Sequence, residues 1–110
     1  MQVDIWVLYQ KGLSAFYESS EIKTAESIGY FDKINDLDPK FVPALAMGAI
    51  ARMILANVYR GDDLETLSRD AKEKAEQGYS IDPSEPLAML ATARIHSGPG
   101  DHEAALDHAR

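Results

Sequence analysis

The dipeptide Asp-Pro occurs twice in this chain of 110 residues, as Asp38-Pro39 and as Asp82-Pro83. Each copy ends a segment of mixed polar and apolar residues and is followed by a run rich in Ala, Leu and Met. Proline has no N–H to donate and disfavours helical geometry at the residue before it, so each dipeptide is expected to end a helix. Because the two copies lie 44 residues apart, the sequence predicts joints between the units of a helical repeat.

Apolar residues recur at helical spacing along the chain, and no stretch alternates as a strand would. We therefore predict an all-α fold, an α-α superhelix of antiparallel helical hairpins with about six helices, the last of them truncated. The expected helices cover residues 3–17, 21–37, 41–59, 64–80, a fifth after residue 84 with a proline in its first turn, and a sixth at 102–110. Side-chain caps are expected from Ser19 or Ser20, Asp62 or Asp63, Ser84 and Asp101.

These helices group into one domain, residues 1–110, with repeat one at 3–39, repeat two at 40–83 and a partial repeat three at 84–110. Small residues are expected where the paired helices cross, because larger side chains hold helix axes apart. Those on the first helices are Gly12, Ala49 and Ala93, and those opposite are Ala25 or Ser27, Ala71 and Ala105. Opposite charges four residues apart predict a solvated outer face on the fourth helix: Glu65–Arg69, Arg69–Glu73, Asp70–Lys74 and Lys72–Glu76.

The chain resembles the tetratricopeptide repeat (TPR), a helix-turn-helix unit of about 34 residues with a small residue in each helix and a closing proline. The resemblance rests on LYQKG in repeat one, AESIGYFDKINDLDPKF at its end, and GDHEAALDHA in repeat three. Repeat two departs from the family period by an insertion of about ten residues around NVYRGDDLETL. Leu45 and Met89 replace the usual large aromatic residue, and Arg52 stands where tyrosine is common.

The combination LYQKGLSAFYESS with AESIGYFDKINDLDPKFVPALA is similar to divergent repeats in two bacterial families. One set follows the catalytic domain of class III adenylate or guanylate cyclases, and the other follows the winged-helix domain of transcriptional regulators. This resemblance implies a cytoplasmic, non-enzymatic, regulatory segment that mediates protein–protein or interdomain contacts. It also implies that the chain is part of a larger protein, whose catalytic or DNA-binding domain lies elsewhere.

In the TPR family, the first helix of each repeat lines a concave groove that binds partners. Carried over by position, the groove of this chain would be apolar and aromatic with one cation, and the Lys/Arg/Asn pattern that clamps a peptide carboxylate is absent. The residues expected to bind a partner are Trp6, Tyr9, Leu13, Phe16, Tyr17, Met53, Leu90 and Arg94. The competing interpretation is that such residues are core, which we favour for Ile50 and Ile54.

Two other functions remain open at this point. A small-molecule sensor would bind an apolar ligand between the first, third and fifth helices, and a closed cavity would favour it over an open groove. A helical enzyme is disfavoured, because the chain has no glycine-rich phosphate loop, no cysteine and no nucleophile elbow. A homodimer that covers the open ends of the repeat array is an alternative to a monomer.

Composition argues against several partners and cofactors. The chain has 18 acidic and 11 basic residues, a net charge of -7, which is a poor match to nucleic acid. The absence of cysteine excludes disulfides and thiolate metal sites. His96, His102 and His108 lack the four-residue spacing of helical zinc pairs, so no metal or cofactor is expected.

Residues 41–59 are apolar on nearly all sides and are close to the length that a membrane-spanning helix needs. Arg52 lies near the middle, where a charge costs about 2.5–3.5 kcal/mol in a bilayer. A helix that is apolar all round also fits the buried centre of a helical bundle, which we favour. The first twelve residues lack the basic region of a signal peptide, and Asp4 interrupts their apolar part.

Overall fold

The computed structural model describes residues 4–96, and within that range the regular elements are all helical. The all-α fold expected from the sequence is therefore confirmed for this part of the chain, while the predicted sixth helix lies outside the described residues. A π-helical turn, η1 (Leu55–Tyr59), and a 3-10 turn, η2 (Gly61–Asp63), join the third helix to the fourth. The α-helices are α1 (Ile5–Tyr17), α2 (Glu21–Leu37), α3 (Val42–Ile54), α4 (Leu64–Ile81) and α5 (Pro86–His96).

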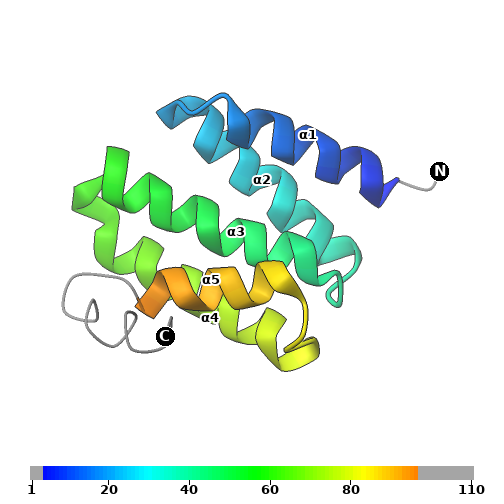
Figure 1. Ribbon diagram of the computed structural model, residues 1–110. Coiled ribbons are helices and arrows are strands. Elements are labelled where there is room, and N and C mark those ends of the chain that lie inside the picture. The colour runs from blue at the N-terminus through cyan, green and yellow to red at the C-terminus, as the bar shows by residue number, and fades with distance from the viewer. Residues whose placement is uncertain (1–3, 97–110) are drawn as a thin grey trace.

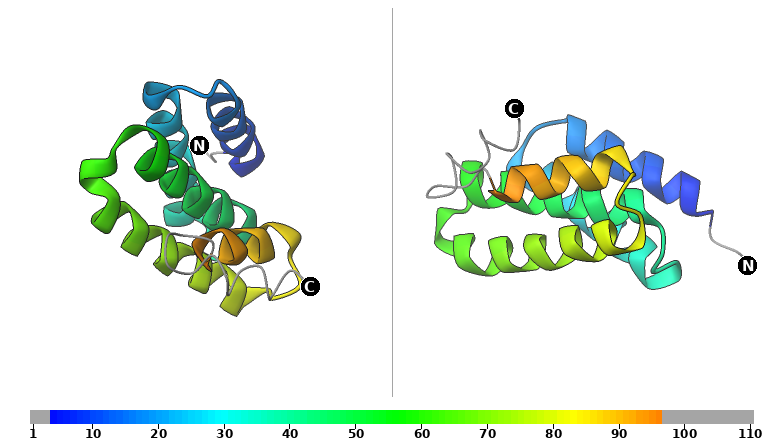
Figure 2. Two further views of the ribbon diagram at one scale, coloured as in Figure 1. Left: turned by 60° about the vertical axis from the view of Figure 1, so that its left-hand side comes forward. Right: turned by 60° about the horizontal axis from the view of Figure 1, so that its bottom comes forward.

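Two helical hairpins, α1 with α2 and α3 with α4, lie next to each other, and α5 follows the second hairpin (Figure 1). The centre of the structure is α3, which packs against α2, α4 and α5. Figure 2 shows α1 and α5 on one side of α3, with α2 and α4 on the other. The first helices of predicted repeats one and three therefore lie on the same side of α3.

The two Asp-Pro joints have the same local geometry. Asp38 has φ and ψ of -143° and 89°, and Asp82 has -147° and 90°. The Asp38 carboxylate accepts the N–H of Lys40 (3.2 Å), and the Asp82 carboxylate accepts that of Ser84 (3.1 Å). An Asp side chain that bonds to the backbone two residues on forms an Asx turn, which leads the chain out of a helix and into a tight turn. The repeated dipeptide therefore encodes a repeated turn.

The helices that precede the two prolines also bury equivalent positions. α2 packs between α1 and α3, and α4 packs against α3 and α5. Residues at equal distances before each proline are buried. In α2 these are Ser27, Phe31 and Ile34, and in α4 they are Ala71, Ala75 and Gly78. The larger side chains of α2 and the smaller ones of α4 make the two crossings different in detail.

Nearly every residue of α3 is buried, since other helices surround it. Only Pro43 and Ile54 among its 13 residues are partly exposed. Among the described residues, one segment, Val42–Tyr59, is long and apolar enough to cross a membrane by length and composition, and 72% of it is buried inside the structure. Such burial is what the core helix of a helical bundle shows, which is the interpretation that the sequence favoured.

Arg52 is the one charged residue in the buried part of α3. Its Nη2 atom lies 2.6 Å from Oδ2 of Asp32 on α2, and its side chain is only 10% exposed. Nη1 also contacts the carbonyl of Gly48 at 3.4 Å. The ion pair joins the two hairpins and offsets the cost of burying the guanidinium.

The small-residue prediction is confirmed for Gly12, whose partner is different from the one expected. A Cβ atom placed on Gly12 would lie 2.6 Å from Cε1 of Phe31. The close approach of α1 to α2 therefore seats the Phe31 ring directly over the glycine, in place of the predicted Ala25 or Ser27. Ala49 and Ala71 are fully buried, whereas Ala93 is exposed and its predicted partner Ala105 lies outside the described residues.

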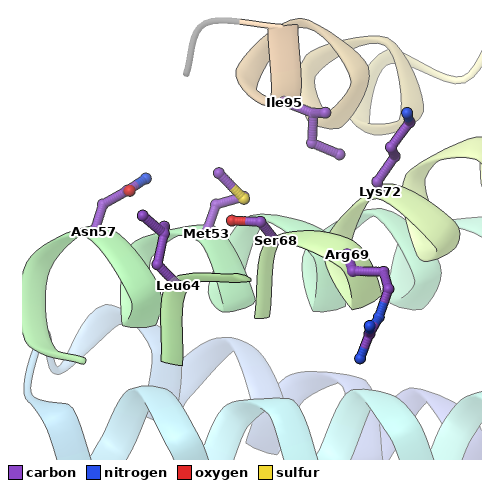
Figure 3. A pocket seen from close by; sticks show the side chains of 7 residues that line it. All are labelled: Met53, Asn57, Leu64, Ser68, Arg69, Lys72 and Ile95. Carbon is purple, nitrogen blue, oxygen red and sulfur yellow. The ribbon is translucent and has the colours of Figure 1, made fainter. Parts of the chain in front are cut away.

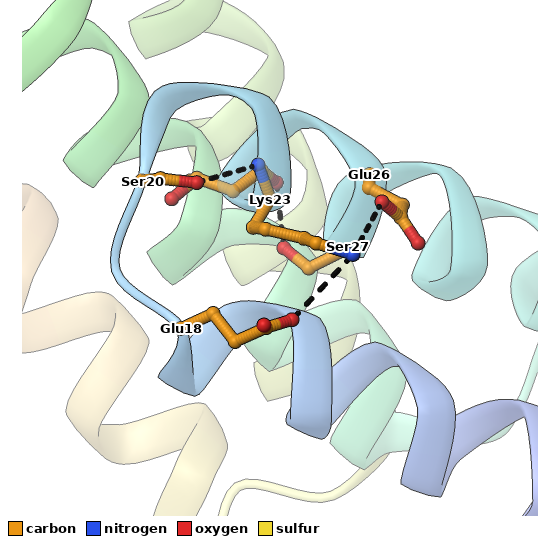
Figure 4. Close-up of polar contacts among 6 residues, drawn as sticks. Glu18, Ser20, Lys23, Glu26 and Ser27 are labelled. Carbon is orange, nitrogen blue, oxygen red and sulfur yellow. Dashed lines mark hydrogen bonds and ion pairs between the residues drawn. The ribbon is translucent and has the colours of Figure 1, made fainter.

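The turn between α1 and α2 is held by side chains at both helix ends (Figure 4). Ser20, rather than Ser19, caps α2 by accepting the N–H of Lys23 at 3.1 Å. The ammonium of Lys23 lies 3.3 Å from Glu26 and 3.5 Å from Glu18. A hydrogen bond to Glu26 and the charge of Glu18 raise the pKa of Lys23. This ion pair at an exposed turn contributes little to stability.

Two other local predictions were wrong. Glu85, not Ser84, caps α5, because its carboxylate accepts the N–H of Leu87 (2.6 Å) and of Ala88 (3.1 Å). Asp63 precedes α4, but neither it nor Asp62 makes a side-chain cap. The predicted charge pairs of α4 do not form ion pairs within the described residues, although the face that carries them is largely exposed as expected.

We predict opposite effects for the same substitution at two glycines. Gly12→Ala forces a methyl group against the Phe31 ring and lowers the free energy of unfolding by about 1–2 kcal/mol. Gly29→Ala, where no atom lies within 4 Å, raises it by about 0.5–1 kcal/mol through helix propensity. Urea denaturation measures both. Equal effects of the two substitutions would contradict the close crossing.

The ion pair is predicted to be asymmetric. Asp32→Ala leaves the guanidinium of Arg52 buried and unpaired, and lowers the free energy of unfolding by about 2–4 kcal/mol. Arg52→Met keeps the apolar volume and removes the buried charge. It leaves Asp32 unpaired, with a side chain that is 39% exposed although its Oδ1 atom is buried, so the expected loss is smaller, at most about 1.5 kcal/mol. Chemical denaturation of both variants tests this order, with Lys23→Met as a surface control that leaves stability unchanged. A larger loss for Arg52→Met would contradict it.

Candidate binding groove

The aromatic residues predicted on α1 divide between two places. At the start of α1, the rings of Trp6 and Tyr9 meet the ring of Phe41, with centroids 5.4 and 5.5 Å apart. Tyr9 also lies 5.9 Å from Phe31. Tyr9 is buried, while Trp6 is 61% exposed. This cluster joins α1 to the residue that precedes α3, so Tyr9 is mainly a core residue and Trp6 covers it from outside.

At the other end of α1, Phe16 and Tyr17 line a cavity of about 370 Å³. The remaining walls come from α2, α3, η1 and α5, and they bring residues together that lie far apart in the sequence. The lining consists of Phe16, Tyr17, Ser19, Thr24, Ile54, Val58, Tyr59 and Arg94. Three of the predicted groove residues therefore meet at one site: Phe16 and Tyr17 at the end of α1, and Arg94 on α5.

The predicted insertion in repeat two builds one wall of this cavity. From the sequence this segment is only a departure from the repeat period, but Val58 and Tyr59 of η1 belong to the lining. The Tyr59 hydroxyl donates to the carbonyl of Ser19 at 2.9 Å. Arg60 lies 3.5 Å from Glu21, so a second contact holds the insertion against the α1–α2 turn. Ser19 itself has a left-handed backbone, with φ of 54°, which the short turn between the helices requires.

Arg94 supplies positive charge at the edge of the cavity. It is exposed, and it makes no ion pair with a residue in the range 4–96. The acidic residues of the neighbouring α1–α2 turn are already paired, Glu18 with Lys23 and Glu21 with Arg60. An anionic group on a partner would therefore find a guanidinium with its donors available beside an apolar and aromatic surface.

The other predicted groove residues are placed as follows. Leu13 is half-buried and packs against the core cluster. Leu90 is 48% exposed on α5, outside the cavity lining. Met53 is only 8% exposed and lines a different cavity, between α3, α4 and α5. Ile50, favoured as core, is buried, and Ile54 is half-buried and reaches the first cavity.

No arrangement for metal chemistry is found in the described range. Among residues 4–96, no group of three or more His, Asp or Glu side chains is placed to hold a metal ion. His102 and His108, weighed as metal ligands from the sequence, lie outside that range, and so do Asp101 and Asp107.

Comparison of the chain with known protein families, with characterised proteins and with solved structures gave no significant match.

We predict that Tyr9 limits stability at alkaline pH. Burial, then the negative charge of Glu85 and the neighbouring Tyr17, raises the pKa of Tyr9 above 10.0. The unfolded chain then loses the phenolic proton at lower pH than the folded chain, so stability is full below about pH 10 and falls as the pH rises further. Tyr9→Phe removes this loss. Melting temperatures measured from about pH 9 to pH 11 test it, and parallel declines in the two proteins would contradict it.

Proposed function

We propose that this chain is a non-enzymatic helical-repeat module that binds another polypeptide or a neighbouring domain of its own chain. In this proposal it is TPR-like and serves as a cytoplasmic regulatory segment of a bacterial adenylate cyclase or transcriptional regulator. The resemblance of the sequence motifs supports the family. The matching Asp-Pro joints and the two consecutive hairpins support a repeat.

The observation that carries the proposal is the cavity between α1, η1 and α5. Phe16 and Tyr17 offer aromatic contact area, and Arg94 offers a guanidinium at the edge. Aromatic residues and arginine are the commonest anchors in protein interfaces. The cavity is the right size for one large side chain of a partner. Trp6 on α1 and Leu90 on α5 are exposed outside the cavity lining. The partner segment would be apolar with an adjacent carboxylate.

A small apolar ligand is the second candidate, because a volume of about 370 Å³ falls within the range of ligand sites. Ligand sites enclose most of their ligand. Here Tyr17 is 72% exposed and Val58 is 65% exposed, so the rim is open to solvent. An open rim favours a side chain that arrives on a polypeptide over a free small molecule.

The test uses two pools of fluorescently labelled peptides, one with Phe or Leu followed by Asp or Glu, the other with Lys in place of the acidic residue. Fluorescence anisotropy is expected to show tighter binding of the acidic pool. Arg94→Glu is expected to weaken that binding about tenfold, since a hydrogen bond to a charged group contributes about 1.5–3 kcal/mol. Tyr17→Ala weakens binding of both pools, because the aromatic contact is shared.

Lys33→Glu is the matched control, because it makes the same change of charge at an exposed residue of α2 outside the cavity lining. It is expected to leave binding nearly unchanged. Equal binding of the two pools, or equal loss with Arg94→Glu and Lys33→Glu, would overturn the assignment of the groove. Binding of a small apolar dye at this site, without binding of either peptide pool, would favour the sensor.

A further inference from the structure

A second cavity lies on a different side of the structure and shares no residue with the first. It has a volume of about 330 Å³ and lies between α3, α4 and α5, where η1 leads into α4. Ile95 points into it from α5, and Lys72 extends from α4 toward α5 (Figure 3). Its lining is Met53, Asn57, Leu64, Ser68, Arg69, Lys72 and Ile95. Met53, Leu64 and Ile95 give this opening an apolar floor.

The position of this cavity along the chain narrows the choice of occupant. Ile95 is the second-last residue of α5, so the segment 97–110 starts next to the cavity. That segment begins with Ser-Gly-Pro-Gly, a composition that favours a turn. A helix over 102–110, as the sequence predicts, would be about 13 Å long at 1.5 Å per residue. That length suffices to run back along α4 from the end of α5.

The residues of the segment match the cavity in apolarity and in charge. In a helix, Ala105, Leu106 and Ala109 share one face, because they recur at intervals of one, three and four residues. Glu103 would lie at the edge of that face, about 60° around the helix from Leu106. The cavity supplies the opposite charge, since Arg69 and Lys72 line it and neither makes an ion pair with a residue in the range 4–96.

We infer that residues 101–109 of the same chain bind this cavity, with Leu106 on the apolar floor and Glu103 facing Lys72. The intramolecular contact is favoured over binding of a second copy. The segment is tethered next to its site, so its effective concentration there is high. The inference does not rest on the proposed function. A peptide can fail to bind the groove between α1 and α5 while this contact forms. A peptide can equally bind that groove while this contact does not form.

The test uses the absence of cysteine from the chain. The full chain is made with Ser68→Cys and Ala105→Cys, and a control chain with Ser68→Cys and Ala104→Cys. A disulfide requires Cβ atoms about 3.5–4.5 Å apart, and residue 104 lies on the other side of the predicted helix. We expect the first pair to form an intramolecular disulfide about tenfold faster than the control under mild oxidation. The rate is expected to be independent of protein concentration.

Equal rates for the two pairs, or no disulfide in either, would overturn the inference. Disulfide-linked dimers whose yield rises with concentration would overturn it in favour of a second copy. Leu106→Asp gives an independent readout, because it is expected to lower the melting temperature by at least about 4 °C. Leu90→Asp, at a side chain that is 48% exposed, is the matched control and is expected to change it less. Equal shifts would also count against the contact.

Discussion

The burial of α3 is the constraint on which the rest of the structure depends. This helix is apolar on all sides, so a stable fold must cover it on all sides. α2 covers it from the first hairpin, α4 from its own hairpin, and α5 from beyond. Small residues make this possible, because Ala44, Ala46, Ala49 and Ala51 are completely buried and let neighbouring helices approach closely. The Arg52–Asp32 ion pair then ties the one buried charge of α3 to the first hairpin.

The groove follows from the way in which α3 is covered. Because α1 packs on α2 and not broadly on α3, the end of α1 stands apart from the end of α3. The space between them becomes a cavity once η1 and Arg94 of α5 close it from two sides. The π-helical turn matters here, because it widens the helix end and carries Val58 and Tyr59 to the α1–α2 turn. The segment predicted as an insertion in repeat two, known from the sequence only by its departure from the repeat length, thus forms one wall of the candidate site.

Much of the local structure could be predicted because it depends on nearby residues. The Asp-Pro joints, the cap at Ser20 and most helix boundaries all follow from short-range chemistry. The boundaries agree within about two residues except at the end of the third helix, where Leu55–Tyr59 forms the π-helical turn η1 in place of the predicted α-helix. The close approach at Gly12 was also visible as a small residue on an apolar face. By contrast, the cap at Glu85 was missed because Ser84 donates its hydroxyl to Asp82 instead of capping the helix.

The long-range features of the site were beyond the sequence. Asp32 and Arg52 are 20 residues apart, and no periodic pattern identifies them as partners. Met53 was predicted to line the groove and Ile54 to be core, but a difference of one residue on a helix turns the side chain by about 100°. Met53 accordingly faces α4 and α5, and Ile54 faces the cavity beside Phe16. The predicted insertion interrupts the resemblance to the TPR period, so position alone could not fix this register.

The central claim is that a partner's side chain enters the cavity between α1, η1 and α5. The most direct measurement is the NMR chemical shift of the methyl groups of Ile54, Val58, Leu64 and Ile95 during titration with the acidic peptide pool. The account predicts shifts at Ile54 and Val58, which line that cavity, and none at Leu64 and Ile95, which line the other. Shifts confined to Leu64 and Ile95, or the absence of shifts at Ile54 and Val58 at saturating peptide, would contradict it.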